Sequence, residues 1–301
     1  MILVTGASGA MGSVLVRRLK DNGHCIRACV VPNDPFVSRI EDSCDDIRRG
    51  DIAHKESIAG LCENITTVFH LAAVILSPHE GDFRRINTEG TRNMVEEATR
   101  SGVGHFIYVS SASVVYPKPT PYSLSKKKAE ELVMNCGLNF TIIRPTLVYG
   151  QSGGMEFEKY LDYLKKFPII PFIGDGKSLK RPVYVNDIIE GLVAVNGNSN
   201  AYGKIYNFSG AQALSMLDFT KLCLMLLGKP QKPIVCLPIW LCRLIAFGMS
   251  LFMKDPPLKW QTIAGMTQDA DLDPAFAVKD LGYRPEKITE RLPKCFPRKR
   301  G

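Results

Sequence analysis

Several features that would point to particular protein classes are missing from this sequence. Its nine cysteines include no CxxC pair and no His/Cys spacing typical of a metal site, so we expect reduced thiols, a cytoplasmic protein and no metal. There is no internal repeat and no low-complexity linker. The net charge is +8, but outside 298–300 the basic residues are scattered. This excludes the basic stripe of a nucleic-acid-binding protein and suits small anionic ligands instead.

Long hydrophobic runs are also scarce, and the prominent one is 234–253, where Arg243 is the only charge and Pro238 stands near the start. Twenty residues approach the length that spans a bilayer, although an arginine near the middle is costly there. Three interpretations stay open. The segment is a buried or dimer-facing helix, a patch lying on a membrane surface and helped by Lys254 and the basic tail, or a true span.

What the chain does contain is enough apolar material, 45% of 301 residues, for one large or two modest domains. Up to Gly150, apolar strand patterns alternate with helical patterns. This alternation predicts an α/β fold with a Rossmann-type doubly wound parallel sheet. The expected strands are 2–5, 25–31, 45–49, 67–71, 106–109 and 140–143, and the expected helices are 10–22, 55–61, 82–102 and 121–136.

A glycine-rich turn, Thr5–Gly12, joins the first strand to the first helix. Gly6 permits a tight turn, Gly9 lets the backbone approach a pyrophosphate, and Gly12 lets the helix pack close to the strand. The helix N-terminus then offers free N–H groups to phosphates. The alternative is a merely tight turn without a ligand. Because the turn starts almost at Met1, we expect no signal peptide.

After Gly150 the alternation stops. We expect helices at 155–166, 186–196, 217–228 and 238–253, with short strands near 170–173 and 204–208. These elements predict a small C-terminal α/β lobe over the carboxyl ends of the strands, where open α/β sheets bind ligands. The predicted domains are 1–150, a dinucleotide-binding domain to which parts of 180–210 return, and 151–301, mainly a substrate-binding lobe.

Tyr122 and Lys126 are four residues apart in a helical stretch, so their side chains share one face. A nearby ammonium lowers the pKa of a phenol from its usual value of about 10. Tyr122 then exchanges a proton with a substrate hydroxyl or carbonyl near neutral pH. Ser110, Ser111 and Ser113 follow the fifth strand and offer a hydroxyl that orients the substrate oxygen. The alternative is an ordinary helix start, in which this spacing is common.

Besides the TGxxGxxG turn and the YxxxK pair, further short motifs stand between the expected elements. They are Gly50-Asp51-Ile52, His70-Leu71-Ala72-Ala73, Asn87-Thr88-Glu89-Gly90-Thr91, Arg144-Pro145-Thr146 through Tyr149-Gly150, Arg181 through Asp187, and Asp273 through Leu281-Gly282-Tyr283 to Pro285. Over nearly the whole chain, this set resembles the extended short-chain dehydrogenase/reductase family in its NAD-dependent epimerase/dehydratase branch.

The resemblance implies an NAD(P) cofactor and a role for each motif. Catalysis falls to Ser111, Tyr122 and Lys126, and substrate binding to Ser111, Ser113 and Arg181, whose guanidinium in relatives often holds a nucleotide-sugar phosphate. The implied cofactor-binding residues are Gly6, Ser8, Gly9, Ala10, Met11, Gly12, Asp51, Ile52, Leu71, Ala72, Ala73, Asn87, Val109, Tyr122, Lys126, Pro145 and Val148.

Two positions depart from the family pattern. In relatives that use NAD, an acidic residue at the end of the second strand holds the ribose 2′-hydroxyl, and the corresponding position here falls near Val30. No arginine follows that could bind the 2′-phosphate of NADP, and Asn33 and Asp34 stand slightly further along the chain than the usual acidic position. The cofactor is therefore NAD or NADP, with a weak preference for NAD. The catalytic serine falls on Ala112 when counted back from Tyr116 and on Ser111 when counted forward, so we choose Ser111, with Ser113 as the second choice.

The leading hypothesis is an enzyme that moves a hydride between nicotinamide and a secondary alcohol carbon of a nucleotide-sugar, as an epimerase, a dehydrogenase or a dehydratase. Tyr122 is the acid/base, Lys126 tunes its pKa, and Ser111 orients the oxygen. Dehydratases of this family usually carry an added acidic pair beside the serine, which this chain lacks, so an epimerase ranks above a dehydratase.

Two alternatives stay open. One is a membrane-associated enzyme, similar to 3β-hydroxysteroid dehydrogenases, that acts on a lipidic alcohol and contacts the membrane through 234–253. The other is a redox-silent NAD(P)-binding protein, against which Tyr122 and Lys126 argue. The family commonly dimerises through the helices that correspond to 82–102 and 121–136, so a homodimer is expected. We expect no nucleic-acid partner.

Overall fold

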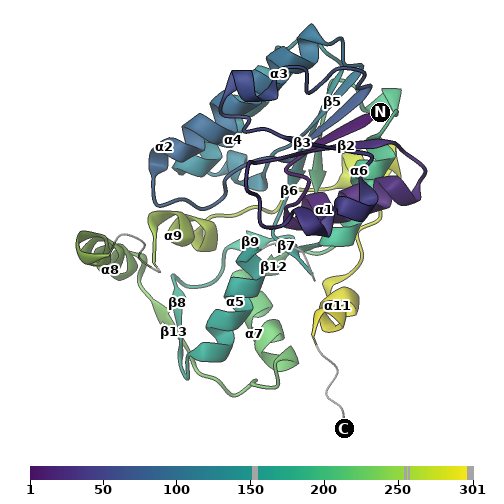
Figure 1. The fold of residues 1–301 in the computed structure, drawn as a ribbon. Helices are drawn as coiled ribbons and strands as arrows, with labels where there is room; N and C mark the ends of the chain where they lie inside the picture. Colours follow the sequence, from purple (N-terminus) through teal and green to yellow (C-terminus); the bar gives the residue numbers. More distant parts are fainter. Residues whose placement is uncertain (151–154, 254–255, 257, 297–301) are drawn as a thin grey trace.

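The computed structural model describes residues 1–150, 155–253, 256 and 258–296, with the backbone alone for 155 and 156 (Figure 1). Lys254 and the basic tail at 298–300 lie outside the described residues.

A seven-stranded parallel sheet forms the centre of the described chain (Figure 1). In spatial order its strands are β11 (Lys204–Phe208), β6 (Phe140–Pro145), β5 (His105–Val109), β4 (Thr67–His70), β1 (Ile2–Thr5), β2 (Ile26–Val30) and β3 (Asp46–Arg49). The inner strands are buried along their whole length, as runs such as Ile2-Leu3-Val4 require in a sheet covered on both faces. The doubly wound α/β fold expected from the sequence is confirmed.

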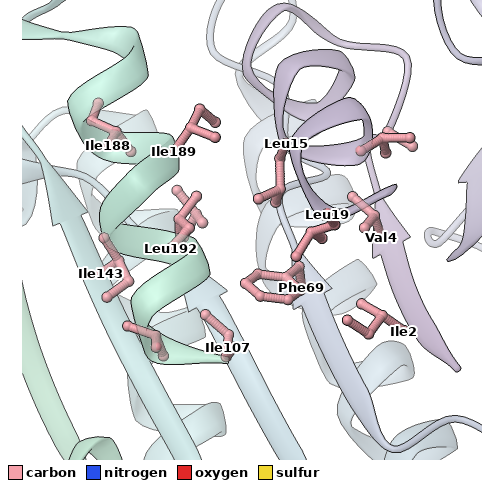
Figure 2. Packing of buried hydrophobic residues seen from close by; sticks show 14 of the residues in the cluster. Ile2, Val4, Leu15, Leu19, Phe69, Ile107, Ile143, Ile188, Ile189 and Leu192 are labelled. Carbon is pink, nitrogen blue, oxygen red and sulfur yellow. The ribbon is translucent and has the colours of Figure 1, made fainter. Parts of the chain in front are cut away.

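Helices cover both faces of the sheet. On one face lie α1 (Ala10–Asp21) and α6 (Val185–Val195), and on the other α3 (Gly90–Arg100) and α4 (Pro121–Met134). Figure 2 shows how the first pair packs against the strands, through Leu15, Leu19, Ile188, Ile189 and Leu192 over Ile2, Val4, Phe69, Ile107 and Ile143. The two apolar layers hold the carboxyl ends of β1, β4, β5 and β6 in fixed positions.

A smaller lobe lies below the carboxyl ends of the strands in Figure 1. Its own core joins α5 (Met155–Lys166), β8 (Ile170–Ile173), α7 (Met216–Leu226) and β13 (Ile234–Leu237). Two short strand pairs lie between this lobe and the sheet, β7 (Val148–Tyr149) with β10 (Val183–Tyr184) and β9 (Leu179–Lys180) with β12 (Leu214–Ser215). The described chain continues through α8 (Ile239–Phe252), α9 (Trp260–Thr267), α10 (Ala275–Leu281) and α11 (Ile288–Arg291).

Three expected elements differ in the structure. The helix expected at 55–61 is a 3₁₀ turn at Lys55–Ile58, and the one at 82–102 is α2 (Glu80–Asp82), a π-helix (Phe83–Glu89) and α3 in succession. The strand at 204–208 is the edge strand β11 of the main sheet, parallel to β6. Helical periodicity cannot separate an i→i+5 from an i→i+4 hydrogen-bond pattern, because the register depends on tertiary contacts.

The apolar segment 234–253 is divided at Pro238 into β13 and α8. Cys242 is the only buried residue of α8, all of which the structure describes, so the helix is not buried within the chain, and a dimer-facing helix stays a prediction. Among the described residues we find no helix with the length and hydropathy needed to cross a membrane. In Figure 1, α8 lies beside α9 at the outer edge of the molecule, away from the sheet.

Candidate active site

Thr5–Gly12 forms the turn between β1 and α1. Gly6 has a φ of 66°, and a Cβ there would lie 2.8 Å from the backbone nitrogen of Ala72. A Cβ on Gly12 would lie 2.1 Å from the carbonyl oxygen of Gly6. The N-cap of α1 is Gly9, which provides no side-chain hydrogen bond to the first turn. The helix N-terminus therefore keeps its N–H groups for an anion.

The loop after β2 returns to this turn. Asn33 has a left-handed backbone, with φ of 59°, which an asparagine tolerates better than most residues. Beyond it, the Asp34 carboxylate accepts a hydrogen bond from Ser8 Oγ. Arg39 lies over the Phe36 ring, 4.1 Å from its centroid, and its Nη1 donates to the carbonyl oxygen of Ser8 at 3.5 Å. The chain thus brings an acidic residue to the glycine-rich turn from beyond the strand end.

Ala10 and Met11 are the first residues of α1 and are only partly buried. Leu71, Ala72 and Ala73 follow β4 and are partly buried as well. The Ala72 N–H donates to Thr5 Oγ1 at 3.3 Å, so the segment after β4 runs beside the glycine-rich turn.

Asp51 and Ile52 lie further along the same edge of the sheet, after β3. The Asp51 carboxylate accepts from Ala53 N at 2.9 Å, and its own N–H donates to Ser57 Oγ at 2.9 Å. Ile52 is buried against Gly90 at the start of α3. Asp51 therefore shapes its own turn while its side chain stays partly exposed.

Tyr122 and Lys126 lie on α4, whose first turn is held by a reciprocal cap. Thr120 Oγ1 accepts from Ser123 N at 3.1 Å, and Ser123 Oγ accepts from Thr120 N at 2.8 Å. Pro121 occupies the first helical position, where its missing N–H costs nothing. The cap fixes where α4 begins, and hence where Tyr122 lies.

Lys126 is fully buried. Its Nζ donates to the carbonyl oxygen of Val109 at 2.7 Å and lies 4.3 Å from the centroid of the Tyr108 ring. Burial lowers the pKa of Lys126 to about 7, while the charge of Glu130 acts in the opposite direction. Glu130 is itself buried, and Arg144 donates to both of its carboxylate oxygens, at 2.9 and 2.6 Å. Lysine, glutamate and arginine together fix α4 against the ends of β5 and β6.

Three serines follow Val109 at the end of β5. Ser110 is buried, and its Oγ has no hydrogen-bond partner among the described residues. Ser111 Oγ lies 3.0 Å from Ser113 Oγ and also accepts from Ser113 N at 3.2 Å. Ser111 and Ser113 are partly exposed, and Ala112 between them is buried. Because Lys126 of α4 donates to the carbonyl oxygen of Val109, the first serine is the next residue after a contact with α4.

Asn87 connects three segments of the site. It lies in the π-helix, and its side chain accepts from Val74 N at 2.8 Å and donates to Val74 O and Ser125 Oγ, both at 3.0 Å. Thr88 Oγ1 donates to Ser125 O at 3.1 Å. Single π-turns are frequent at functional sites, and this one aims the amide between α4 and the segment after β4.

His70, the last residue of β4, is buried beside the glycine-rich turn. Its ring nitrogens lie 2.7 Å from Thr5 Oγ1 and 3.0 Å from Thr91 Oγ1, so it joins β1 and β4 to α3. Burial, with a smaller contribution from the charge of Lys126, lowers the pKa of His70 to about 3. The imidazole is therefore neutral at physiological pH.

Pro145 and Val148 lie where the chain leaves β6 and enters β7. Pro145 is the last residue of β6, opposite Phe208 of β11, and Val148 pairs with Val183. Thr146 Oγ1 donates to the carbonyl oxygen of Arg181, which ties the two segments together.

Arg181 forms an ion pair. Its Nε donates to the Asp271 carboxylate, and both side chains are about one-quarter to one-third exposed. A phosphate bound by Arg181 would share its guanidinium with Asp271.

Lys180 is a buried cation of this region for which the sequence carried no signal. Its Nζ donates to Tyr116 OH at 3.2 Å and to the carbonyl oxygen of Gln268, and burial lowers the pKa of Lys180 to about 8. Tyr116 follows the serine loop, so Lys180 ties that loop to the smaller lobe.

The chain is similar to known proteins over most of its length. The model of the NAD dependent epimerase/dehydratase family matches residues 2–208. A 3 beta-hydroxysteroid dehydrogenase/Delta 5-->4-isomerase of Mycobacterium tuberculosis is 25% identical, over 98% of this chain and 89% of its own. A UDP-glucose 4-epimerase of Vibrio cholerae is 26% identical, over 96% of this chain and 92% of its own.

A solved structure shares the fold over nearly its full length. A dTDP-glucose 4,6-dehydratase double mutant from Streptomyces venezuelae, with NAD and DAU bound, superposes with a TM-score of 0.78 at 21% identity. The similarity covers 98% of this chain and 95% of that one.

Proposed function

Since this chain belongs to the NAD dependent epimerase/dehydratase family and its cofactor is NAD, we propose that it oxidises a secondary alcohol carbon of a nucleotide-sugar by hydride transfer. The family resemblance seen in the sequence and its preference for NAD are both confirmed. We further propose that the enzyme is an epimerase, which returns the hydride within the same cycle.

The binding region fits a dinucleotide. A Cβ at Gly12 would strike the carbonyl of Gly6, so the close approach of α1 to the turn requires a glycine there. The N-terminus of α1 lacks a side-chain cap, and Ser110 Oγ is buried without a partner among the described residues. In this proposal 1–150 holds the dinucleotide together with β11, and 151–301 mainly covers the substrate.

Tyr122 and Lys126, one turn apart at the start of α4, carry the proposal. When bound, the nicotinamide accepts a hydride from the carbinol carbon and can give it back. Tyr122 takes the hydroxyl proton as the carbonyl forms and returns it when the carbonyl is reduced. Protonated Lys126 stabilises the phenolate of Tyr122, and Ser111 donates a hydrogen bond to the substrate oxygen. An epimerase presents the other face of the carbonyl before the hydride returns.

Replacing Tyr122 with phenylalanine tests this mechanism. We expect Tyr122→Phe to lower kcat for UDP-glucose epimerisation by at least about 10²-fold, because the proton transfer is lost, while NAD binding measured by calorimetry stays near normal. Tyr202→Phe is the matched control, because Tyr202 lies by His105 at the amino-terminal end of the sheet. Full activity of Tyr122→Phe would overturn the mechanism.

A lipidic alcohol is the second candidate substrate. The similarity to a 3 beta-hydroxysteroid dehydrogenase and the exposed apolar side chains of α8 favour it. An enzyme that reduces added NAD with a 3β-hydroxysteroid in detergent, and ignores UDP-sugars, would have this function. A protein that binds NAD and acts on neither would be the redox-silent binding protein.

A further inference from the structure

The surface of α8 is apolar where a surface helix is normally polar. Trp240, Leu244, Phe247 and Leu251 recur at spacings of four, three and four residues, so they share one face, called here the α8 face. Their exposed fractions are 61–67%, and Phe252 at the end of the helix is 89% exposed. Contiguous exposed apolar side chains of this size mark an interaction site.

Basic side chains lie beside this face, with Asp269 as the acidic residue of the adjoining cavity. Arg243 is exposed on α8, and its guanidinium lies 4.7 Å from the ring centroid of Trp260 on α9. A cation beside a tryptophan, next to an apolar stripe, matches the boundary between lipid headgroups and acyl chains.

A cavity of about 320 Å³ lies next to the α8 face. It is lined from α8 and α9 by Ile239, Arg243 and Trp260, and from the loop before Tyr122 by Lys118. The Asp269 carboxylate at its rim accepts a hydrogen bond from Leu179 N at 2.8 Å. The α8 face therefore adjoins the loop that leads to the catalytic helix.

We propose that the α8 face docks the protein on the surface of an anionic phospholipid bilayer. Fourteen residues make a helix about 21 Å long, shorter than the roughly 30 Å hydrocarbon core, so α8 lies on the membrane rather than across it. Arg243 and Lys118 beside this face complement anionic headgroups. This inference does not depend on the substrate.

Tryptophan fluorescence of the full chain with lipid vesicles tests the proposal. The protein contains only two tryptophans, Trp240 and Trp260, and both lie at this surface. With vesicles of phosphatidylcholine and phosphatidylglycerol we expect a blue-shifted emission, quenching by brominated acyl chains and co-sedimentation that salt weakens. Vesicles of phosphatidylcholine alone should bind the protein at least about tenfold more weakly.

Variants distinguish vesicle binding through the α8 face from nonspecific hydrophobic binding. The double variant Phe247→Ser/Leu251→Ser should bind the mixed vesicles at least about tenfold more weakly with unchanged circular dichroism, because both side chains are exposed. Phe276→Ser is the matched control, since Phe276 on α10 is 71% exposed, and it should bind like the wild type. Wild type that stays unbound, or a double variant that binds equally well, would overturn the proposal. The proposal would also be overturned if the wild type did not bind vesicles but self-associated, and the double variant abolished that self-association.

Discussion

At the scale of single residues, the burial of Lys126 lowers the stability of the folded protein at neutral pH. Lys126 is buried with its Nζ on one backbone carbonyl, and burial lowers its pKa from 10.5 to about 7. The unfolded chain therefore binds more protons than the folded chain between about pH 7 and 10.5. The free energy of unfolding must rise with pH across this window, because the penalty of a buried ammonium disappears there.

Lys126→Met tests the role of this residue in activity and in the pH dependence of stability. We expect activity to fall by at least about 10²-fold, since nothing then stabilises the Tyr122 phenolate. The free energy of unfolding of the cofactor-free wild type should increase from pH 7 to 9 by more than that of the variant, with a slope of up to about 1.4 kcal/mol per pH unit. Urea denaturation at the two pH values measures it. Equal slopes would show that Lys126 is not the titrating group.

The choice between the two serines is also decided at this scale. Ser111 Oγ receives a hydrogen bond from Ser113 N, which fixes its position beside β5. We expect Ser111→Ala to lower kcat/KM by about 10²-fold, the usual cost of losing one hydrogen-bond donor to the reacting oxygen. Ser113→Ala should cost less than about tenfold, because Ser113 acts through Ser111. Steady-state kinetics would give the opposite order if Ser113 holds the substrate oxygen.

At the scale of elements, α4 and the π-helix position the site. The reciprocal cap at Thr120 and Ser123 fixes the first residue of α4, and the π-helix turns Asn87 toward Ser125 and Val74. Neither device contacts a substrate directly. The cap orients Tyr122, which does so in the proposed mechanism, and such positioning makes a proton transfer efficient. The π-helix orients Asn87, one of the implied cofactor-binding residues.

Thr120→Ala should uncouple stability from activity. Losing the cap lowers the free energy of unfolding by about 1 kcal/mol and loosens the start of α4, so kcat should fall several-fold while the affinity for NAD changes little. Ser215→Ala is the control, because Ser215 Oγ caps α7 in the smaller lobe by accepting from Asp218 N at 3.0 Å. It should lose similar stability and keep kcat. An unchanged kcat in Thr120→Ala would mean that the cap does not position Tyr122.

At the scale of the whole molecule, the parallel sheet brings distant segments to one edge. Residues after β1, β4, β5 and β6 meet there because parallel strands end on the same side. The smaller lobe closes over this edge through short strand pairs and the ion pair of Arg181 with Asp271. Buried neutral histidines lie within the same sheet, and they make its stability depend on pH.

We expect the folded protein to lose stability as the pH falls below about 6.5. Burial lowers the pKa of His70 to about 3 and that of His105 to about 4, so the unfolded chain binds more protons at acid pH. Each histidine contributes up to about 1.4 kcal/mol per pH unit below about 6.5. Urea denaturation between pH 7.5 and 5 measures the slope, and His70→Gln should reduce it. A slope unchanged in that variant would remove His70 from this account.

Much of the fold followed from local patterns. Buried strands with runs such as Ile2-Leu3-Val4, and helices with apolar faces, are recognisable because burial on one or both sides imposes a period on the sequence. The short pairs β7–β10 and β9–β12 were not predicted, since two-residue strands carry no period. Pro238 is visible in the sequence as a point where 234–253 can divide, but the local pattern does not show that the apolar face of α8 is exposed.

The sequence by itself determined the family, the order of strands and helices, and the identity of the glycines, Tyr122 and Lys126, because these depend on local spacing and on residue chemistry. Only the tertiary structure decided how the groups meet. Asp34 reaches Ser8 through a left-handed Asn33, Lys180 reaches the serine loop from the smaller lobe, and α8 turns its apolar side to solvent. Such contacts join residues far apart in the chain, and their geometry depends on the packing of the whole core rather than on any local pattern.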